Sequence, residues 1–200
     1  MGVNTKLKIL RTAAREFAEN GYRKTTIRTI CQKAAVNVAA VNYHFSGKSE
    51  LYCQTLDWLM EAICGNEVVI SKDKPPRENI RLWVNECIQS RATGRTWQNE
   101  LALKMVFHEL QGPSDNYDYF YQSRILPDLE VLRDSIIRGL GGDISETNVK
   151  IRLFALIGKA IFYVFHQNVV DRFGGADFLK KHQEKIIESI VAEATNDFID

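Results

Sequence analysis

The chain has 200 residues, of which 45% are hydrophobic and 26% are charged, and its net charge is +1 at pH 7. This length and apolar content are enough for a buried core in one or two domains. No apolar run approaches the roughly 20 residues that a membrane span requires, and the N-terminus lacks the apolar stretch of a signal peptide. The four cysteines form no C-x-x-C pair, so we expect reduced thiols in a cytoplasmic protein with no membrane partner.

The charges are distributed unevenly along the chain. Residues 1–50, which we call the head, hold nine Lys or Arg and three Glu, a net charge of +6, whereas the remaining residues carry a net charge of −5. Ordinary solvated helix faces account for some of these charges but not easily for their segregation. The pattern is expected if only the head meets phosphate groups.

Residues 25–51 predict two short helices joined by a tight turn. Thr25 or Thr26 can cap the first helix, because a hydroxyl there accepts a hydrogen bond from an otherwise unpaired backbone N–H. Asn37 offers both a turn and a cap for a second helix beginning near Val38. The apolar residues of the first helix recur at helical spacing: Ile27, Ile30, Cys31 and Ala34. This arrangement is typical of a helix-turn-helix DNA-binding unit.

The second helix opens with small residues and continues with residues that carry hydrogen-bonding groups. The major groove admits such a helix, whose N-terminal residues then meet base edges. The alternative is a small-residue packing helix in which Tyr43 and His44 are satisfied locally. The small residues are Val38, Ala39 and Ala40, and the polar ones are Asn42, Tyr43 and His44.

Residues 6–60, taken in order, resemble the N-terminal domain of the TetR family of transcriptional regulators. The matching segments are ILRTAAREFAENGY, TTIRTIC, AAVNVAAVNYHF and GKSELY, with Gly21-Tyr22, Tyr43-His44-Phe45 and Lys48 at the family's positions. Asn42 departs from the pattern, since members commonly carry an aromatic residue there. The contact at that position therefore bears on which base sequence is preferred.

The resemblance implies roles for nine residues of the head. It assigns phosphate positioning to Thr26, Tyr43, His44 and Lys48, and base-edge reading to Arg28, Val38, Ala39, Ala40 and Asn42. Lys48 is the strongest phosphate candidate, because it can also lie near the positive N-terminus of the next helix. For Arg28, a position facing only solvent is the common alternative.

The rest of the chain predicts further helices and no strand, so the expected fold is all-α. A head of residues 1–50 precedes an effector-binding and dimerisation domain of residues 51–200, with a linking helix over 49–64. Residues 71–76 form a polar, Pro-rich break, and Pro127 begins or kinks a turn within the element 115–140. The other expected helices are 77–92, 97–110, 147–168 and 176–198.

The last two helices suggest how the chain assembles. Apolar residues in 151–165 cover more than one helix face, and Ala155 and Gly158 allow close helix approach. The resemblance implies a homodimer through the last two helices, packed as a four-helix bundle. The alternative is a buried central helix of a monomer.

Residues 78–198 also resemble, more weakly, the effector domain of the CecR-type branch of the TetR family. The features are FHEL, Pro113-Ser114, Leu126-Pro127 and IGKAIFYVFHQNVV. The implied effector is a small, partly apolar molecule. Separately, the aromatic residues of this part are expected mostly in the core, but a pocket between its helices would be lined by some of them and by a few polar groups. The candidate lining residues are Trp83, Met105, His108, Glu109, Phe120, Phe162 and His166.

An enzyme is the weaker interpretation. The GKS at Gly47–Ser49 lacks the earlier glycine of a phosphate-binding loop, since Asn42 occupies that position, and His108 and Glu109 point about 100° apart on a helix. We expect no catalytic residue, metal or cofactor. The predicted function is a dimeric regulator that binds an inverted-repeat operator in double-stranded DNA, a repressor released by its effector. The alternative is a DNA-binding protein without a small-molecule effector, either a nucleoid factor or a partner-controlled regulator.

Overall fold

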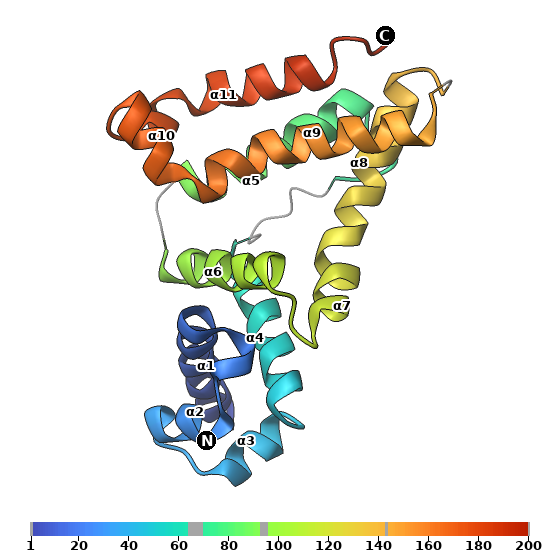
Figure 1. The fold of residues 1–200 in the computed structure, drawn as a ribbon. Coiled ribbons are helices and arrows are strands. Elements are labelled where there is room, and N and C mark those ends of the chain that lie inside the picture. The colour runs from blue at the N-terminus through green and yellow to red at the C-terminus, as the bar shows by residue number, and fades with distance from the viewer. Residues whose placement is uncertain (1, 64–69, 93–95, 143, 200) are drawn as a thin grey trace. The chain divides into compact units, whose positions relative to one another are not determined.

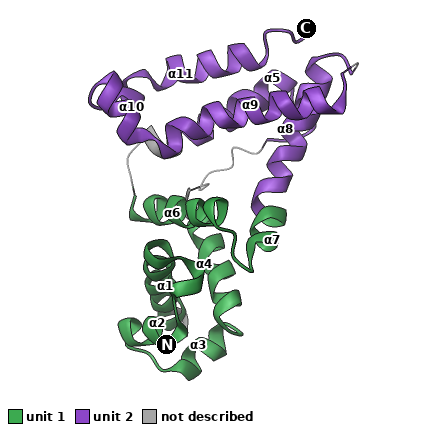
Figure 2. Ribbon diagram, in the orientation of Figure 1, with its two compact units in different colours: residues 1–65, 96–123 green, residues 66–95, 124–200 purple. Residues whose placement is uncertain are grey.

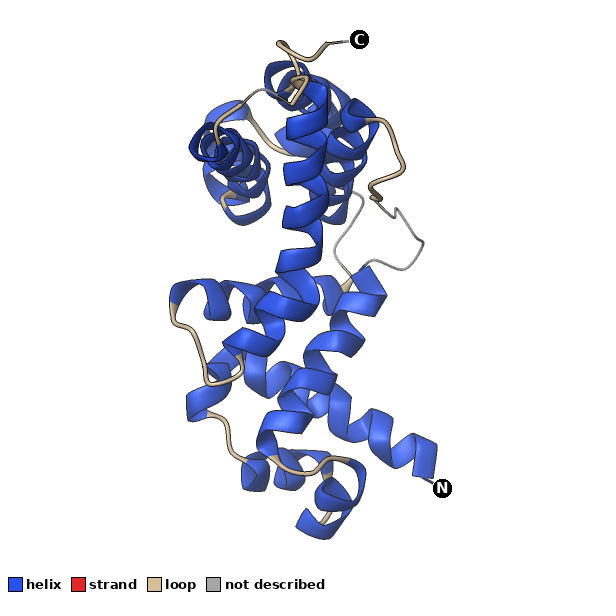
Figure 3. Cartoon of the chain, turned by 90° about the vertical axis from the view of Figure 1, so that its right-hand side faces the viewer, coloured by secondary structure: helices blue, strands red, loops and turns tan. Residues whose placement is uncertain are grey.

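The computed structural model describes residues 2–63, 70–92, 96–142 and 144–199, and every regular element in these ranges is helical, as predicted (Figures 1 and 3). In the described ranges no single helix is long and apolar enough to cross a membrane, and only the pair Glu146–Phe165 and Gln167–Gly174, bent by 78°, reaches that length and hydropathy together. The elements are α1 (Gly2–Lys24), α2 (Ile27–Ala34), α3 (Val38–His44), α4 (Lys48–Ile63), α5 (Pro76–Ala92), α6 (Trp97–Gln111), α7 (Tyr117–Phe120), the π-helical turn η1 (Tyr121–Ile125), α8 (Leu126–Gly139), α9 (Glu146–Phe165), α10 (Gln167–Gly174) and α11 (Phe178–Ala194).

Two compact units divide the helices (Figure 2). Unit 1 comprises residues 1–65 and 96–123, and unit 2 comprises residues 66–95 and 124–200. Packing therefore groups α6 and α7 with the helices of the head, although they follow α5 in the sequence. The predicted division into a DNA-binding domain of residues 1–50 and an effector-binding domain of residues 51–200 stays a prediction.

In unit 1, α1 packs against α4 and α6. Phe17 of α1 is fully buried, and its ring meets that of Tyr52 edge-on, with 4.9 Å between the ring centroids. Gly21 breaks the helical course of α1 at φ 70°, a value that favours glycine because it has no Cβ. The apolar face predicted for the first short helix is confirmed by the buried Ile30 and Ala34.

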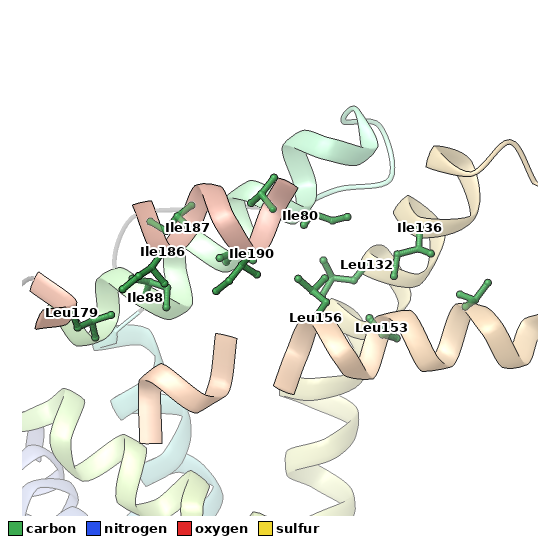
Figure 4. Packing of buried hydrophobic residues seen from close by; sticks show 13 residues of the cluster. Ile80, Ile88, Leu132, Ile136, Leu153, Leu156, Leu179, Ile186, Ile187 and Ile190 are labelled. Carbon is green, nitrogen blue, oxygen red and sulfur yellow. The ribbon is translucent and has the colours of Figure 1, made fainter. Parts of the chain in front are cut away.

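In unit 2, α5 packs against α8, α9 and α11 around a core of aliphatic side chains (Figure 4). The side chain of Asn79 is fully buried and closes the turn before α5: its Nδ2 donates to the Ser71 carbonyl at 2.7 Å and to the Ser135 hydroxyl at 3.0 Å. The labelled core residues are Ile80, Ile88, Leu132, Ile136, Leu153, Leu156, Leu179, Ile186, Ile187 and Ile190.

Two predicted elements differ from the structure. The helix expected over 147–168 ends at Phe165, because His166 leaves the helical region at φ −111° and ψ 31°, and the separate helix α10 follows. The element expected over 115–140 is divided into α7, η1 and α8. The turn predicted at Pro127 is not found: Pro127 lies in the first turn of α8, directly after the π-helical turn η1, and the chain stays helical on both sides of it.

Candidate nucleic-acid interface

The first helix of the pair, α2, begins at a capping threonine. Thr26 has extended backbone angles, and its hydroxyl accepts from the Thr29 N–H at 3.1 Å and hydrogen-bonds the Thr29 hydroxyl at 2.9 Å. Thr25, the other candidate cap, is buried and donates to the Gly21 carbonyl at 2.9 Å. Ala35 ends α2 in a left-handed conformation with φ 48°. Local hydrogen bonds thus set both ends of this helix.

The second helix, α3, is held to unit 1 from one side. The side chain of Asn37 accepts from the Ala40 N–H at 2.7 Å, so the predicted cap and start of α3 are confirmed. Val41 and Phe45 are buried below the helix, and the Lys6 ammonium lies 5.6 Å from the centroid of the Phe45 ring. Because these side chains anchor one face, the opposite face is left to solvent.

That open face carries most of the residues predicted to meet DNA. The Tyr43 side chain is 84% exposed, so it does not pack inside the unit as the alternative of a simple packing helix required. His44 is half-buried, and its ring contacts that of Tyr43. The base-reading and phosphate-positioning roles stay predictions. Thr26, Arg28, Val38, Ala39, Asn42 and Tyr43 are exposed, and Ala40, His44 and Lys48 are half-buried.

Lys48 opens α4 and is held against the end of α1. Its ammonium nitrogen lies 4.2 Å from the centroid of the Tyr22 ring and 3.5 Å from the Arg23 carbonyl oxygen. Partial burial lowers the pKa of Lys48, and the Asp115 carboxylate offsets part of this shift. The contact of Tyr22 with Lys48 was not predicted, although Gly21-Tyr22 belongs to the family pattern that marked this position.

Other cations of the head also make contacts within unit 1. Lys33 forms an ion pair with Glu16, a side chain that is almost completely buried. The guanidinium of Arg15 lies 5.9 Å from the centroid of the Trp97 ring on α6. Part of the positive charge of the head therefore supports its packing as well as its surface potential.

Four of the seven predicted effector residues lie in unit 1: Met105, His108, Glu109 and Phe120. Glu109 is 1% exposed, and its Oε1 accepts from the Tyr52 hydroxyl at 2.6 Å. His108 Nε2 donates to the Ala18 carbonyl at 3.2 Å. Met105 and Phe120 are buried. These four side chains contribute to the packing of α6 and α7 within the unit.

The other three lie in unit 2: Trp83, Phe162 and His166. The Trp83 indole N–H donates to the Asp128 carboxylate at 3.2 Å. Burial raises the pKa of Asp128, and the bond from Trp83 offsets part of that rise. The Phe162 and His166 rings stack with 5.0 Å between centroids. The predicted set is thus divided between the units, and its role stays a prediction.

Unit 2 exposes an apolar face on α9, which we call the α9 stripe: Ile151, Phe154, Ala155, Gly158 and Phe162. Beside the stripe, α9 and α11 border two hollows of about 160 and 470 Å³, which share Ala155, Lys159, Ile190 and Glu193 as lining residues. Lys159 and Glu193 form an ion pair across them. A Cβ atom added at Gly158 would meet nothing within 4 Å. The stripe can therefore accept a closely packed helix.

Both parts of the chain match known protein families. Residues 9–54 match the family of bacterial regulatory proteins, tetR family, and residues 76–198 match the C-terminal domain of the HTH-type transcriptional dual regulator CecR. The chain is 25% identical to CecR of Shigella flexneri over 199 residues, which cover 94% of this chain and 89% of that protein. It is 43% identical over 51 residues to the probable HTH-type transcriptional regulator YttP of Bacillus subtilis, covering 26% of this chain and 25% of that protein.

Solved structures share the fold. AibR, in complex with isovaleryl coenzyme A and operator DNA, superposes with a TM-score of 0.65 at 19% identity, covering 98% of this chain and all of that chain. FadR from Bacillus subtilis, in complex with stearoyl-CoA, superposes with a TM-score of 0.64 at 16% identity, covering 96% and 99% of the two chains. At these identities the likeness concerns the arrangement of the helices.

Proposed function

Because the chain belongs to the TetR family of bacterial transcriptional regulators and carries its DNA-binding domain, we propose that it is a dimeric repressor released from its operator by a small effector. The observation that supports this most directly is α3, which is anchored by Val41 and Phe45 and turns its other face to solvent. The proposed site of action is the cytoplasm, where double-stranded DNA is its partner.

On the exposed face of α3, we assign base reading to Val38, Ala39, Ala40 and Asn42, together with Arg28 of α2. Phosphate positioning falls to Thr26, Tyr43, His44 and Lys48. The amide of Asn42 can donate and accept at once, which suits the edge of adenine in the major groove. The small side chains before it let the helix approach the base edges closely.

Dimerisation is proposed because α3, the recognition helix, is short. A helix of seven residues reaches few base pairs, and each mismatched pair costs only about 1–3 kcal/mol. Two copies related by a twofold axis read an inverted repeat when their recognition helices lie roughly 34–36 Å apart, one turn of DNA. The α9 stripe supports this assembly, because it combines large side chains such as Phe154 with a gap at Gly158, so that two copies can interlock.

The effector is proposed from the helical unit 2 and from what similar proteins bind. AibR and FadR were solved with isovaleryl coenzyme A and stearoyl-CoA, so acyl thioesters are the first class to test. An effector releases the operator only by binding more tightly to the released state, and a coupling of about 1–3 kcal/mol lowers operator affinity roughly 5- to 150-fold. We propose that a tilt of α4, which follows α3 directly, alters the spacing of the recognition helices.

The test is selection of fragmented genomic DNA by the purified protein at about 150 mM salt, where nonspecific binding is weak, followed by footprinting of the enriched fragments. Protection of both halves of a short inverted repeat is the expected result, and acyl-CoA added to the complex should release it. Binding without enrichment would indicate a nucleoid-type protein instead. Sequence-specific binding that no effector candidate alters would favour a regulator controlled by a protein partner.

A further inference from the structure

The segment that joins α6 to α7 is tied to the helices of the head by several polar contacts. We call residues 108–116 the α6–α7 corner. At its start, His108 donates to the Ala18 carbonyl of α1, and its ring lies 3.7 Å from the ideal Cβ position of Gly21. Arg23, in the last turn of α1, donates to the Pro113 carbonyl at 3.3 Å. Contacts with α1 thus lie at two places along the corner.

The contact between Glu109 and Tyr52 joins the corner to α4. The Glu109 carboxylate accepts from the Tyr52 hydroxyl at 2.6 Å through one oxygen and from the Ser114 N–H at 3.0 Å through the other. Burial and the hydrogen bond to Glu109 raise the pKa of Tyr52, so its hydroxyl stays protonated and available as a donor. Both side chains are about 1% exposed. Because a buried carboxylate without its donors is strongly unfavourable, this contact restricts where α4 can lie relative to α6.

A second contact lies one turn earlier on α4. The Ser49 hydroxyl donates to the Asn116 side-chain oxygen, and Asn116 is 5% exposed. The Nδ2 group of Asn116 is buried without a hydrogen-bond partner in the described part of the chain. An unpaired buried donor is unfavourable, so an arrangement of the corner that gave the Asn116 amide group an acceptor would be lower in free energy at this position. The contact is therefore suited to change.

The contacts of Glu109 with Tyr52 and of Asn116 with Ser49 lie at a point of the chain that links α3 to unit 2. Only residues 45–47 separate α3 from α4, so the first turns of α4, with Ser49 and Tyr52, determine where the recognition helix lies. On the other side, α7 continues through η1 into α8, whose Leu132 and Ile136 belong to the core of unit 2. A π-helical turn such as η1 is rare and often marks a functional position in a helix. The corner thus contacts the first turns of α4 and, through α7 and η1, leads along the chain into α8 of unit 2.

We propose that Glu109 and Asn116 are positioning residues for DNA recognition, which hold the first turns of α4, and with them α3, in the geometry that reads the operator. This inference rests on the proposed function and names the residues through which an effector would act on the head. Neither residue touches DNA in this scheme. Their loss lowers discrimination between operator and other DNA, while phosphate binding remains.

The test is a double-mutant cycle of Tyr52→Phe and Glu109→Gln, with Glu61→Gln, which removes the same charge from an exposed position of α4, as the matched control. Affinities for the selected operator and for a scrambled duplex are measured at one salt concentration, well below the melting temperature of each variant. Each single variant is expected to reduce operator preference about 5- to 30-fold, within the usual range of coupling between sites. The double variant should be no worse than the singles, and Glu61→Gln should keep the preference of the parent chain.

Two results of the double-mutant cycle would overturn the proposal. If operator preference is unchanged while the melting temperature falls, the pair stabilises the unit and does not position α4. If the losses of operator preference caused by Tyr52→Phe and by Glu109→Gln multiply in the double variant, the two residues act independently of one another. Should the parent chain itself show no operator preference, the proposed function fails, and amide hydrogen exchange then decides: Glu109→Gln must accelerate exchange in residues 38–52 relative to Glu61→Gln, and equal rates would refute the positioning role.

Discussion

The ammonium group of Lys48 lies 4.2 Å from the centroid of the Tyr22 ring. A cation over an aromatic face at a partly exposed site gains roughly 0.5–1 kcal/mol, enough to favour one placement of the long side chain. The same nitrogen is 3.5 Å from the Arg23 carbonyl, at the negative end of α1. Tyr22 thus holds the charge of Lys48 at the junction of α1 and α4, where it is already ordered before DNA arrives.

Lys48→Ala is predicted to weaken binding to all duplexes, because a phosphate contact carries no sequence information. The slope of log affinity against log salt should become shallower by about 0.9, the value for one released counterion. Tyr22→Leu is the control: it removes the ring and keeps the charge, so the slope should stay while affinity falls modestly. Titrations at several salt concentrations measure both. A Lys48→Ala variant with unchanged slope and reduced thermal stability would show that Lys48 only joins the two helices.

Asn42→Ala is predicted to alter which operator is preferred. Asn42 lies on the exposed face of α3, and the loss of a bidentate base contact costs about 1–3 kcal/mol at one base pair and little elsewhere. Binding selections from a randomised half-site library, with parent and variant in parallel, would show relaxed preference at one position of each half-site. A uniform loss of affinity with the same preferred sequence would contradict base reading by Asn42.

Gly158→Leu tests the dimer through the α9 stripe. A Cβ at Gly158 meets nothing within 4 Å, and leucine is a better helix former than glycine by nearly 1 kcal/mol, so the isolated chain should fold at least as well. In the dimer the larger side chain blocks close helix approach, and the dissociation constant should rise at least about tenfold, or 1.4 kcal/mol. Sedimentation equilibrium measures it. Glu130→Leu, at an exposed position of α8, should leave dimerisation unchanged. Equal effects of the two substitutions would place the interface elsewhere.

Asp128→Asn is predicted to stabilise the chain at pH 7. Burial raises the pKa of Asp128, so the folded state resists ionisation, and its stability falls as pH rises from the unfolded value of about 3.8 through the folded value. The amide oxygen can still accept from Trp83. The melting temperature should rise by a few degrees, since about 1 kcal/mol corresponds to roughly 2–4 °C in a chain of this size. The gain should shrink as pH falls below the folded pKa. A lower melting temperature at pH 7 would mean that the bond to an ionised carboxylate outweighs its burial.

Local sequence was enough to predict α2 and α3. Their caps bond only three residues ahead, from Thr26 to Thr29 and from Asn37 to Ala40, and the apolar spacing of α2 repeats within one turn of helix. Such interactions depend on neighbours in the chain, so residue type and spacing specify them. The end of α9 was predicted wrongly because no glycine or proline marks the break at His166, and the polar residues 166–168 are compatible with a continuing helix.

By itself the sequence determined the all-α class, the two short helices α2 and α3 with their caps, and the family. The tertiary structure decided which distant side chains meet: Lys48 with Tyr22 of α1, and Glu109 with Tyr52, 57 residues away. It also decided that Tyr43 faces solvent and that the predicted effector residues are divided between two units. The spacing of apolar residues in the sequence indicates which face of each helix is apolar. The partner of that face depends on how all the helices pack together, because burial and long-range hydrogen bonds are properties of the assembled core.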